Sequence, residues 1–323
     1  MQYLCFLHYN AYHMLIITGT VAHDYIMDFP GMFSDHILPD KVHNINLSFI
    51  VNNFERRRGG TAGNVSYALG LLGTEHLLFT AAGKDFGEYK RAFGKLNIET
   101  KHILIDKDNY TSTGFGLTDK SDNQIWGYFY GASDRIAQLE LRTVAKKGYL
   151  VLIGPSGAAG SMSFVRQCIE LGLEYMFDPG FILTQVSNDD LLLGVKHASY
   201  IVGNDYEINL VESRIKDFRT LTKNKVLVTT FGQKGSLIEQ DGKKISIEVA
   251  KVKTAVDPTG AGDAWRAGFL TGIVRNLDLQ TCGQLGSVIA AHAVSCYGTQ
   301  EYKFTKQQFA KRYKDTYNTE IEL

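Results

Sequence analysis

Short apolar runs that end at glycine or aspartate alternate with stretches of helical periodicity over most of the chain. Such near-continuous apolar runs are typical of parallel strands that are buried on both faces. The pattern predicts core strands over 14–19, 76–82, 149–154, 174–178, 199–203 and 226–231, and helices over 61–72, 86–95, 161–171 and 205–213. This alternation predicts an α/β fold, a doubly wound, mostly parallel sheet with helices on both faces.

Three stretches depart from that rhythm. Residues 235–240 and 244–249 predict a hairpin around an Asp-Gly turn. The stretches 44–58 and 110–131 predict strands rich in aromatic residues, and we expect a small sheet lid inserted at about 24–58 and 108–132. Such a lid would exclude water from a site beneath it. A sheet without such a role, or a dimer surface, is the alternative interpretation.

Composition narrows the class of partner. The 323 residues are 44% hydrophobic, enough for a large core, and 34 Lys and Arg balance 34 Asp and Glu. Because the chain has no net charge that would attract nucleic acid or an anionic membrane, we expect a small-molecule partner, no nucleic acid and no membrane.

Cysteine usage and the N-terminus bear on location. The four cysteines are far apart and form no CxxC pair, which indicates reduced thiols in a cytoplasmic protein. No run reaches the roughly 18 apolar residues of a membrane span, and the first residues carry no basic segment typical of a signal peptide. Residues 1–13 are expected to be a disordered extension before a domain at 14–323. Whether Met1 or Met14 is the native start stays open.

The strongest chemical signal is a glycine-rich turn at 256–262 that runs into a predicted helix. Gly260 and Gly262 leave room for backbone N–H groups to approach an anion, and the positive end of the helix favours a phosphate there. Asp263 stands where a carboxylate could take the proton of an attacking hydroxyl. An ordinary helix start remains the alternative, because the spacing differs from that of a nucleotide P-loop.

Other candidates follow predicted strands, at the sheet edge where ligands bind in such folds. Thr20 and Asp24 follow the first strand, and Asp24 could accept hydrogen bonds from sugar hydroxyls, although a surface turn carboxylate is an alternative. Gly60 would let a substrate lie against the backbone. Asn64 could donate or accept beside it, or be a satisfied core amide.

Two further turns fit a nucleotide. Asn204 and Glu207 have the spacing of a capping box, so a structural role competes with a functional one. Thr230, Gly232 and Gly235 form a turn of small residues that could admit phosphates and ribose, or simply join two strands.

Taken together, these motifs resemble the ribokinase-like (PfkB) carbohydrate kinases in order and spacing, over nearly the whole chain after residue 13. The resemblance is closest to the bacterial adenosine kinases of that family. It is carried by the segments 18–24, 29–31, 47–49, 58–64, 204–207, 230–235, 257–272 and 298–301.

The resemblance implies roles for these residues. Asp263 would be the catalytic base, and the backbone of Gly260, Ala261, Gly262 and Asp263 the anion hole for the transferred phosphoryl group. ATP would be the phosphate donor.

The resemblance also implies how nucleotide, cations and acceptor are bound. Asn204 and Glu207 would organise Mg²⁺ through water, and Thr230, Gly232 and Gly235 would hold the nucleotide. A monovalent cation, K⁺ where one is needed, would bind near Asp257 and Thr259. The implied acceptor pocket comprises Thr20, Asp24, Gly60 and Asn64. Tyr128 of the lid would cover the nucleobase of a nucleoside acceptor.

One departure from the pattern of the adenosine kinases affects which nucleobase the site would prefer. The adenosine kinases that this chain resembles have polar amides after the strand that ends at 178, whereas this chain has Phe181. Phe181 could stack on a base or face the core, and a site without hydrogen bonds to the base edge discriminates less. We therefore predict a kinase for the 5′-hydroxyl of a ribonucleoside, with adenosine first. A broader nucleoside kinase, a sugar kinase or a catalytically silent nucleotide sensor are the alternatives, and the lid could supply a homodimer contact.

Overall fold

The computed structural model describes residues 12–37, 46–121 and 123–322, and its centre is an eight-stranded sheet. Neighbouring strands are parallel across the sheet, except for two antiparallel strands at one edge. In spatial order the strands are β14 (Lys243–Ile247), β13 (Ser236–Gln240), β12 (Val226–Thr230), β11 (Tyr200–Asn204), β10 (Glu174–Phe177), β9 (Tyr149–Ile153), β1 (Met14–Thr18) and β4 (His76–Leu78).

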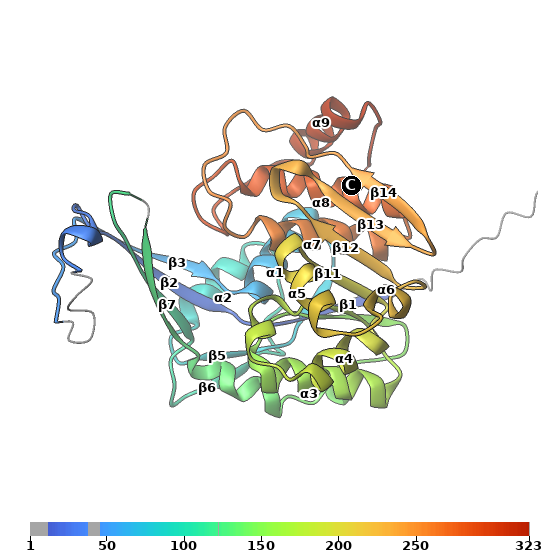
Figure 1. Ribbon diagram of the computed structural model, residues 1–323, viewed down its shortest axis with the longest axis horizontal. Helices are drawn as coiled ribbons and strands as arrows, with labels where there is room; N and C mark the ends of the chain where they lie inside the picture. The colour runs from blue at the N-terminus through green and yellow to red at the C-terminus, as the bar shows by residue number, and fades with distance from the viewer. Residues whose placement is uncertain (1–11, 38–45, 122, 323) are drawn as a thin grey trace, which may run out of the picture.

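Helices cover both faces of this sheet (Figure 1). Alternate residues of each strand point to opposite faces, so two hydrophobic cores form, one against each group of helices. One face is covered by α1 (Thr61–Leu72), α2 (Gly87–Gly94), α7 (Ala261–Val274), α8 (Leu279–Ala293) and α9 (Lys306–Tyr317). The other is covered by α3 (Gly157–Leu171), α4 (Asn188–His197), α5 (Asp205–Arg214) and α6 (Phe218–Leu221).

The predicted α/β class, the parallel sheet and the hairpin at its edge are confirmed. The continuous strand expected over 76–82 is wrong. The chain leaves the sheet after β4 and forms β5 (Ala81–Gly83), which pairs with β6 (Leu104–Asp106) in a separate two-stranded sheet. A near-continuous apolar run does not mark this change of pairing partner, because both halves of the run are buried.

A second, four-stranded sheet projects from the core (Figure 1). We call it the lid sheet. Its strands, in order, are β3 (Asn53–Gly59), β2 (Ala22–Asp28), β7 (Ser112–Thr118) and β8 (Gln124–Phe129). Residues 46–52 were expected to be strand and are not, while residues 44 and 45 lie outside the described residues. The strand β2 takes that place, so Asp24 lies in the lid sheet and not in a loop.

Most of the predicted N-terminal extension, residues 1–11, lies outside the described residues. Tyr12 is buried, and its hydroxyl donates a hydrogen bond of 2.5 Å to Glu174 Oε2. At this residue the expected loose extension is wrong, because Tyr12 already packs on the domain. Within the described ranges, no helix is long and apolar enough to cross a membrane.

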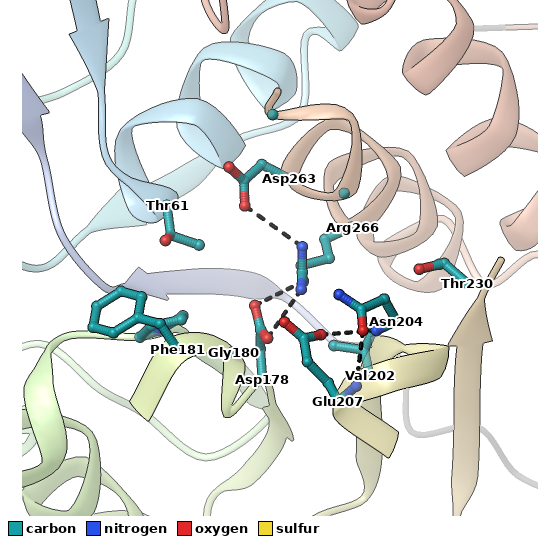
Figure 2. Close-up of a pocket in the computed structure, with 13 residues that line it drawn as sticks. Thr61, Asp178, Gly180, Phe181, Val202, Asn204, Glu207, Thr230, Asp263 and Arg266 are labelled. Atoms are coloured by element: carbon teal, nitrogen blue, oxygen red, sulfur yellow. Dashed lines mark hydrogen bonds and ion pairs between the residues drawn. The ribbon is translucent and has the colours of Figure 1, made fainter. Parts of the chain in front are cut away.

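Parallel topology positions the candidate site. The strands β10, β11 and β12 end side by side at one edge of the sheet. Asp178 directly follows β10, Asn204 ends β11 and Thr230 ends β12. The N-terminus of α7 lies over the same edge, so the glycine-rich turn meets three strand ends that are distant in sequence (Figure 2).

Candidate active site

A cavity of about 320 Å³ opens at this edge of the sheet. Seven of the residues selected from the sequence line it, and they come from four separate segments of the chain. The lining residues are Thr61, Pro155, Asp178, Gly180, Phe181, Val202, Asn204, Glu207, Thr230, Gly260, Gly262, Asp263 and Arg266.

Asp263 lies in the first turn of α7, and its side chain is 14% exposed. Its Oδ2 accepts a hydrogen bond of 2.8 Å from Asn64 Nδ2, and its Oδ1 lies 3.5 Å from Arg266 Nη1. Burial raises the pKa of Asp263, while Arg266 and the Asn64 hydrogen bond oppose that rise. A carboxylate with a raised pKa at the wall of a cavity is suited to accept a proton.

The turn before α7 has the features of an anion site. Gly260 has a φ of +75°, and a Cβ there would lie 2.9 Å from the Thr299 side chain, so glycine is required on both counts. The Ala261 N–H donates to the Pro258 carbonyl at 3.2 Å and closes the turn. The N–H groups of Gly262 and Asp263 make no hydrogen bond within the described part of the chain. These two are therefore the donors available to an anion.

Asn204 and Glu207 form the capping box that their spacing predicts. Asn204 Oδ1 accepts from the Glu207 N–H, and Glu207 Oε2 accepts from the Asn204 N–H, both at 2.8 Å. Both residues also line the cavity. The structural role and a role at the cavity are thus compatible, because each side chain keeps polar atoms that the box does not use.

The turn after β12 meets the cavity only through Thr230. Gly232 and Gly235 have φ values of +57° and +88°, and neither lines the cavity. A Cβ at Gly235 would lie 2.2 Å from the Ile247 carbonyl oxygen, so this glycine is required by strand packing. Asp257 and Thr259 also lie outside the cavity lining. The Asp257 carboxylate accepts from the N–H groups of Thr259, at 2.8 Å, and Gly298, at 3.0 Å.

Backbone contacts tie the loop after β1 to the start of α1. The Thr20 carbonyl accepts from the N–H groups of Ala62, at 2.9 Å, and Gly63, at 3.2 Å. Gly60 has a φ of +82°, and a Cβ there would lie 2.6 Å from the same carbonyl. Thr20 and Gly60 therefore set the position of α1, which carries Asn64 to Asp263.

Asp24 lies on β2, against the backbone of both neighbouring strands. A Cβ at Gly59 or Gly114 would come within 2.3 Å or 2.6 Å of its carboxylate. This carboxylate makes no hydrogen bond to any residue that the structure describes, and burial raises its pKa to about 6. Tyr128 lies opposite Gly114, is 72% exposed and stacks on Trp126 at 5.7 Å. A carboxylate without a partner beside an exposed ring is suited to a ligand that has both hydroxyls and a flat group.

Phe181 is 47% exposed and lines the cavity, so it does not face the core. Sequence reasoning assigned no role to Asp178, Arg266 and Gln300. Arg266 lies between Asp263 and Asp178 (Figure 2), and its Nε is 2.7 Å from Asp178 Oδ2. Gln300 Nε2 donates to Asn64 Oδ1 at 2.9 Å. Arg266 could have been noticed, because it follows Asp263 by one helical turn.

The charge of the cavity fits a hard cation. Asp178, Glu207 and Asp263 line it together with a single guanidinium, Arg266. No group of three potential ligands among His, Cys, Asp and Glu is close enough to hold a metal in the described ranges. Glu207 and Asn204 present oxygen atoms at the cavity that could hold the waters of a hard cation.

Comparison with known proteins gives a consistent result. Residues 32–306 match the family model described as pfkB family carbohydrate kinase. A nucleoside kinase of Methanothermobacter thermautotrophicus is 33% identical over 295 residues, which cover 88% of this chain and 91% of that protein. A nucleoside kinase of Methanocaldococcus jannaschii is 31% identical over 264 residues, covering 79% of this chain and 85% of that protein.

Solved structures agree. The nucleoside kinase of Burkholderia thailandensis in complex with inosine superposes with a TM-score of 0.84 at 30% identity, covering 95% of this chain and 99% of that one. The chain therefore belongs to the PfkB family of carbohydrate kinases and is a phosphotransferase with an alcohol group as acceptor.

Proposed function

We propose that this protein transfers the γ-phosphoryl group of ATP to the 5′-hydroxyl of a ribonucleoside, with adenosine as the first candidate acceptor. The observation that carries the proposal is the Asp263 carboxylate at the wall of the cavity, next to two N–H groups that have no partner among the described residues. The relatives named nucleoside kinases, one of them with inosine bound, support a nucleoside as acceptor.

The proposed step uses the chain's own residues as follows. Asp263 holds the acceptor hydroxyl and takes its proton as the hydroxyl oxygen forms a bond to the γ-phosphorus. The bond between that phosphorus and the β–γ bridging oxygen breaks, so the products are a nucleoside 5′-monophosphate and ADP. The N–H groups of Gly262 and Asp263 bind the charge on the transferred group.

Asn204, Glu207 and Thr230 bind the donor side of the cavity in this proposal. Glu207 and Asn204 would hold Mg²⁺ through its waters, and the ion would shield the phosphate charge. Asp257 and Thr259 stay candidates for a monovalent cation. Each Asp257 oxygen accepts one N–H and keeps a lone pair for a further ligand.

The lid sheet supplies the acceptor contacts in this proposal. Asp24 of the lid sheet accepts hydrogen bonds from the ribose hydroxyls, and Tyr128 of the lid sheet covers the nucleobase. Phe181, which lies outside the lid sheet, also covers the nucleobase. Support comes from the unpartnered Asp24 carboxylate and from the stacked, exposed pair Trp126 and Tyr128. Burial by the closed lid would exclude water from the reacting groups.

A role in purine salvage in the cytoplasm fits this chemistry. The described cysteines, Cys168, Cys282 and Cys296, are all free thiols.

The choice of acceptor is tested directly by measuring ADP release with adenosine, inosine, cytidine and ribose. We expect turnover with nucleosides to exceed turnover with ribose, because ribose leaves Tyr128 and Phe181 without a partner. We expect adenosine to be a substrate. Turnover of inosine should be within about tenfold of that of adenosine, since Phe181 offers no hydrogen bond to the edge of the nucleobase. Faster turnover of ribose than of any nucleoside would favour a sugar kinase. No turnover with any acceptor would favour a sensor.

The variant Asp263→Asn tests whether Asp263 is the catalytic base. The amide keeps the size of the side chain but cannot take a proton, so we expect kcat to fall at least about a hundredfold. Binding of ATP and acceptor, measured by calorimetry, should change little. Turnover close to that of the unchanged protein would show that another group takes the proton.

The pH dependence of acceptor binding tests Asp24. Its pKa lies near 6, above the ordinary value, so the carboxylate that accepts the ribose hydrogen bonds is present above that pH and lost below it. We expect the Kd of inosine to rise about tenfold between pH 7 and pH 5, as the ionised fraction falls. Asp24→Asn should bind inosine more weakly at pH 7 and with little pH dependence. A Kd that is the same for both proteins at pH 7 would remove Asp24 from the pocket.

We also propose a homodimer formed through the outer face of the lid sheet. That face carries Phe54, Phe115, Ile125 and Phe129, each between 46% and 60% exposed. Light scattering should give twice the chain mass for the unchanged protein and the single mass for Phe115→Glu. A monomer at all concentrations of the unchanged protein would contradict this assignment.

A further inference from the structure

Arg266 is the single cationic side chain among the described residues that line the cavity, which also has three carboxylates in its lining. Its side chain is 11% exposed. A buried guanidinium is costly unless it is paired and hydrogen-bonded, so its partners define what it does. None of the roles derived above for the transfer of the phosphoryl group uses this residue.

Asp178 binds the guanidinium at two points. Arg266 Nε lies 2.7 Å from Asp178 Oδ2, and Nη2 donates to Oδ1 at 3.0 Å. Asp178 is fully buried, and its N–H donates to the Ile153 carbonyl at 3.0 Å, which fixes it to the end of the sheet. The Nε contact is an ion pair without hydrogen-bond geometry, so one hydrogen bond and the attraction of opposite charges hold the guanidinium against the end of the sheet.

The remaining nitrogen, Nη1, faces Asp263 Oδ1 at 3.5 Å. Asn64 binds the other oxygen of the same carboxylate. The two oxygens of Asp263 thus have separate partners, one from α1 and one from α7. Together they restrict rotation of the carboxylate about its last bond.

Gly262 provides the space for this arrangement. A Cβ at Gly262 would lie 2.9 Å from Arg266 Nη1, and its φ is not in the left-handed region. The guanidinium cannot easily move aside, since Asp178 holds it at two points. The need for a small residue at this position therefore comes at least in part from Arg266.

We propose that Arg266 is a positioning residue, anchored by Asp178, which orients the Asp263 carboxylate toward the acceptor hydroxyl. The proposal rests on the proposed function, in which Asp263 is the base. An unanchored arginine beside a triphosphate would pair with a phosphate oxygen, because that pairing is strong and two-pronged. Asp178 competes with this pairing, because it contacts two nitrogens of the guanidinium and holds it away from solvent.

Arg266→Lys and Asp178→Asn test the anchor, since each keeps a polar side chain of similar length. Lysine cannot contact both carboxylates in the same way, and asparagine removes the charge that holds the guanidinium. We expect each change to lower kcat about ten- to a hundredfold, with the KM for ATP within about twofold. Because the two residues act in series, the double variant should be no more than about threefold slower than the slower single variant.

Arg135→Lys is the matched control. Arg135 Nε donates to the buried Asp106 carboxylate at 3.0 Å, away from the cavity lining, so this change should leave kcat within about twofold. Thermal unfolding and ATP binding are measured for every variant first. If Arg266→Lys does not fold, Asp178→Asn still decides the question.

Two results would overturn the proposal. A large rise in the KM for ATP with unchanged kcat would mean that Arg266 binds phosphate. Losses in kcat that multiply in the double variant would mean that Asp178 and Arg266 act independently. Failure of the proposed function would look different, because Asp263→Asn would then keep its activity while the Arg266 variants could still be slow.

Discussion

The structure depends most on how one carboxylate is held. Asp263 is largely enclosed by protein, and burying a charge is unfavourable unless other groups compensate. Here the compensation comes from the Asn64 amide, the Arg266 guanidinium and the N-terminal end of α7. These three groups come from two helices that pack together, so the position of the carboxylate is fixed by the fold itself.

The same constraint extends outward from the cavity to the lid sheet. Asn64 is held by Gln300, and the neighbouring Thr299 hydroxyl donates to the Arg58 carbonyl of β3 at 2.9 Å. Thr299 also lies against Gly260, where any side chain would meet it. One short segment after α8 therefore touches both the glycine-rich turn before α7 and the root of the lid sheet. The cavity and the lid sheet share this support.

Much of this arrangement could be predicted from local patterns. The buried strands, the glycine-rich turn and the capping box at Asn204 follow from short-range rules, and the structure agrees with each. The strand β2 and the split of the strand expected over 76–82 could not, since pairing partners are decided by distant segments. The pairing of Arg266 with Asp178 could not be predicted either. They are 88 positions apart, and only the sheet brings them together.

A crystal structure with a nucleoside and ADP bound would test the central claim most directly. The account predicts that the 5′-oxygen of the nucleoside lies within hydrogen-bond distance of an Asp263 carboxylate oxygen, about 2.6 to 3.2 Å, with Arg266 still paired to Asp178. A 5′-oxygen that points away from Asp263, toward some other base, would contradict it.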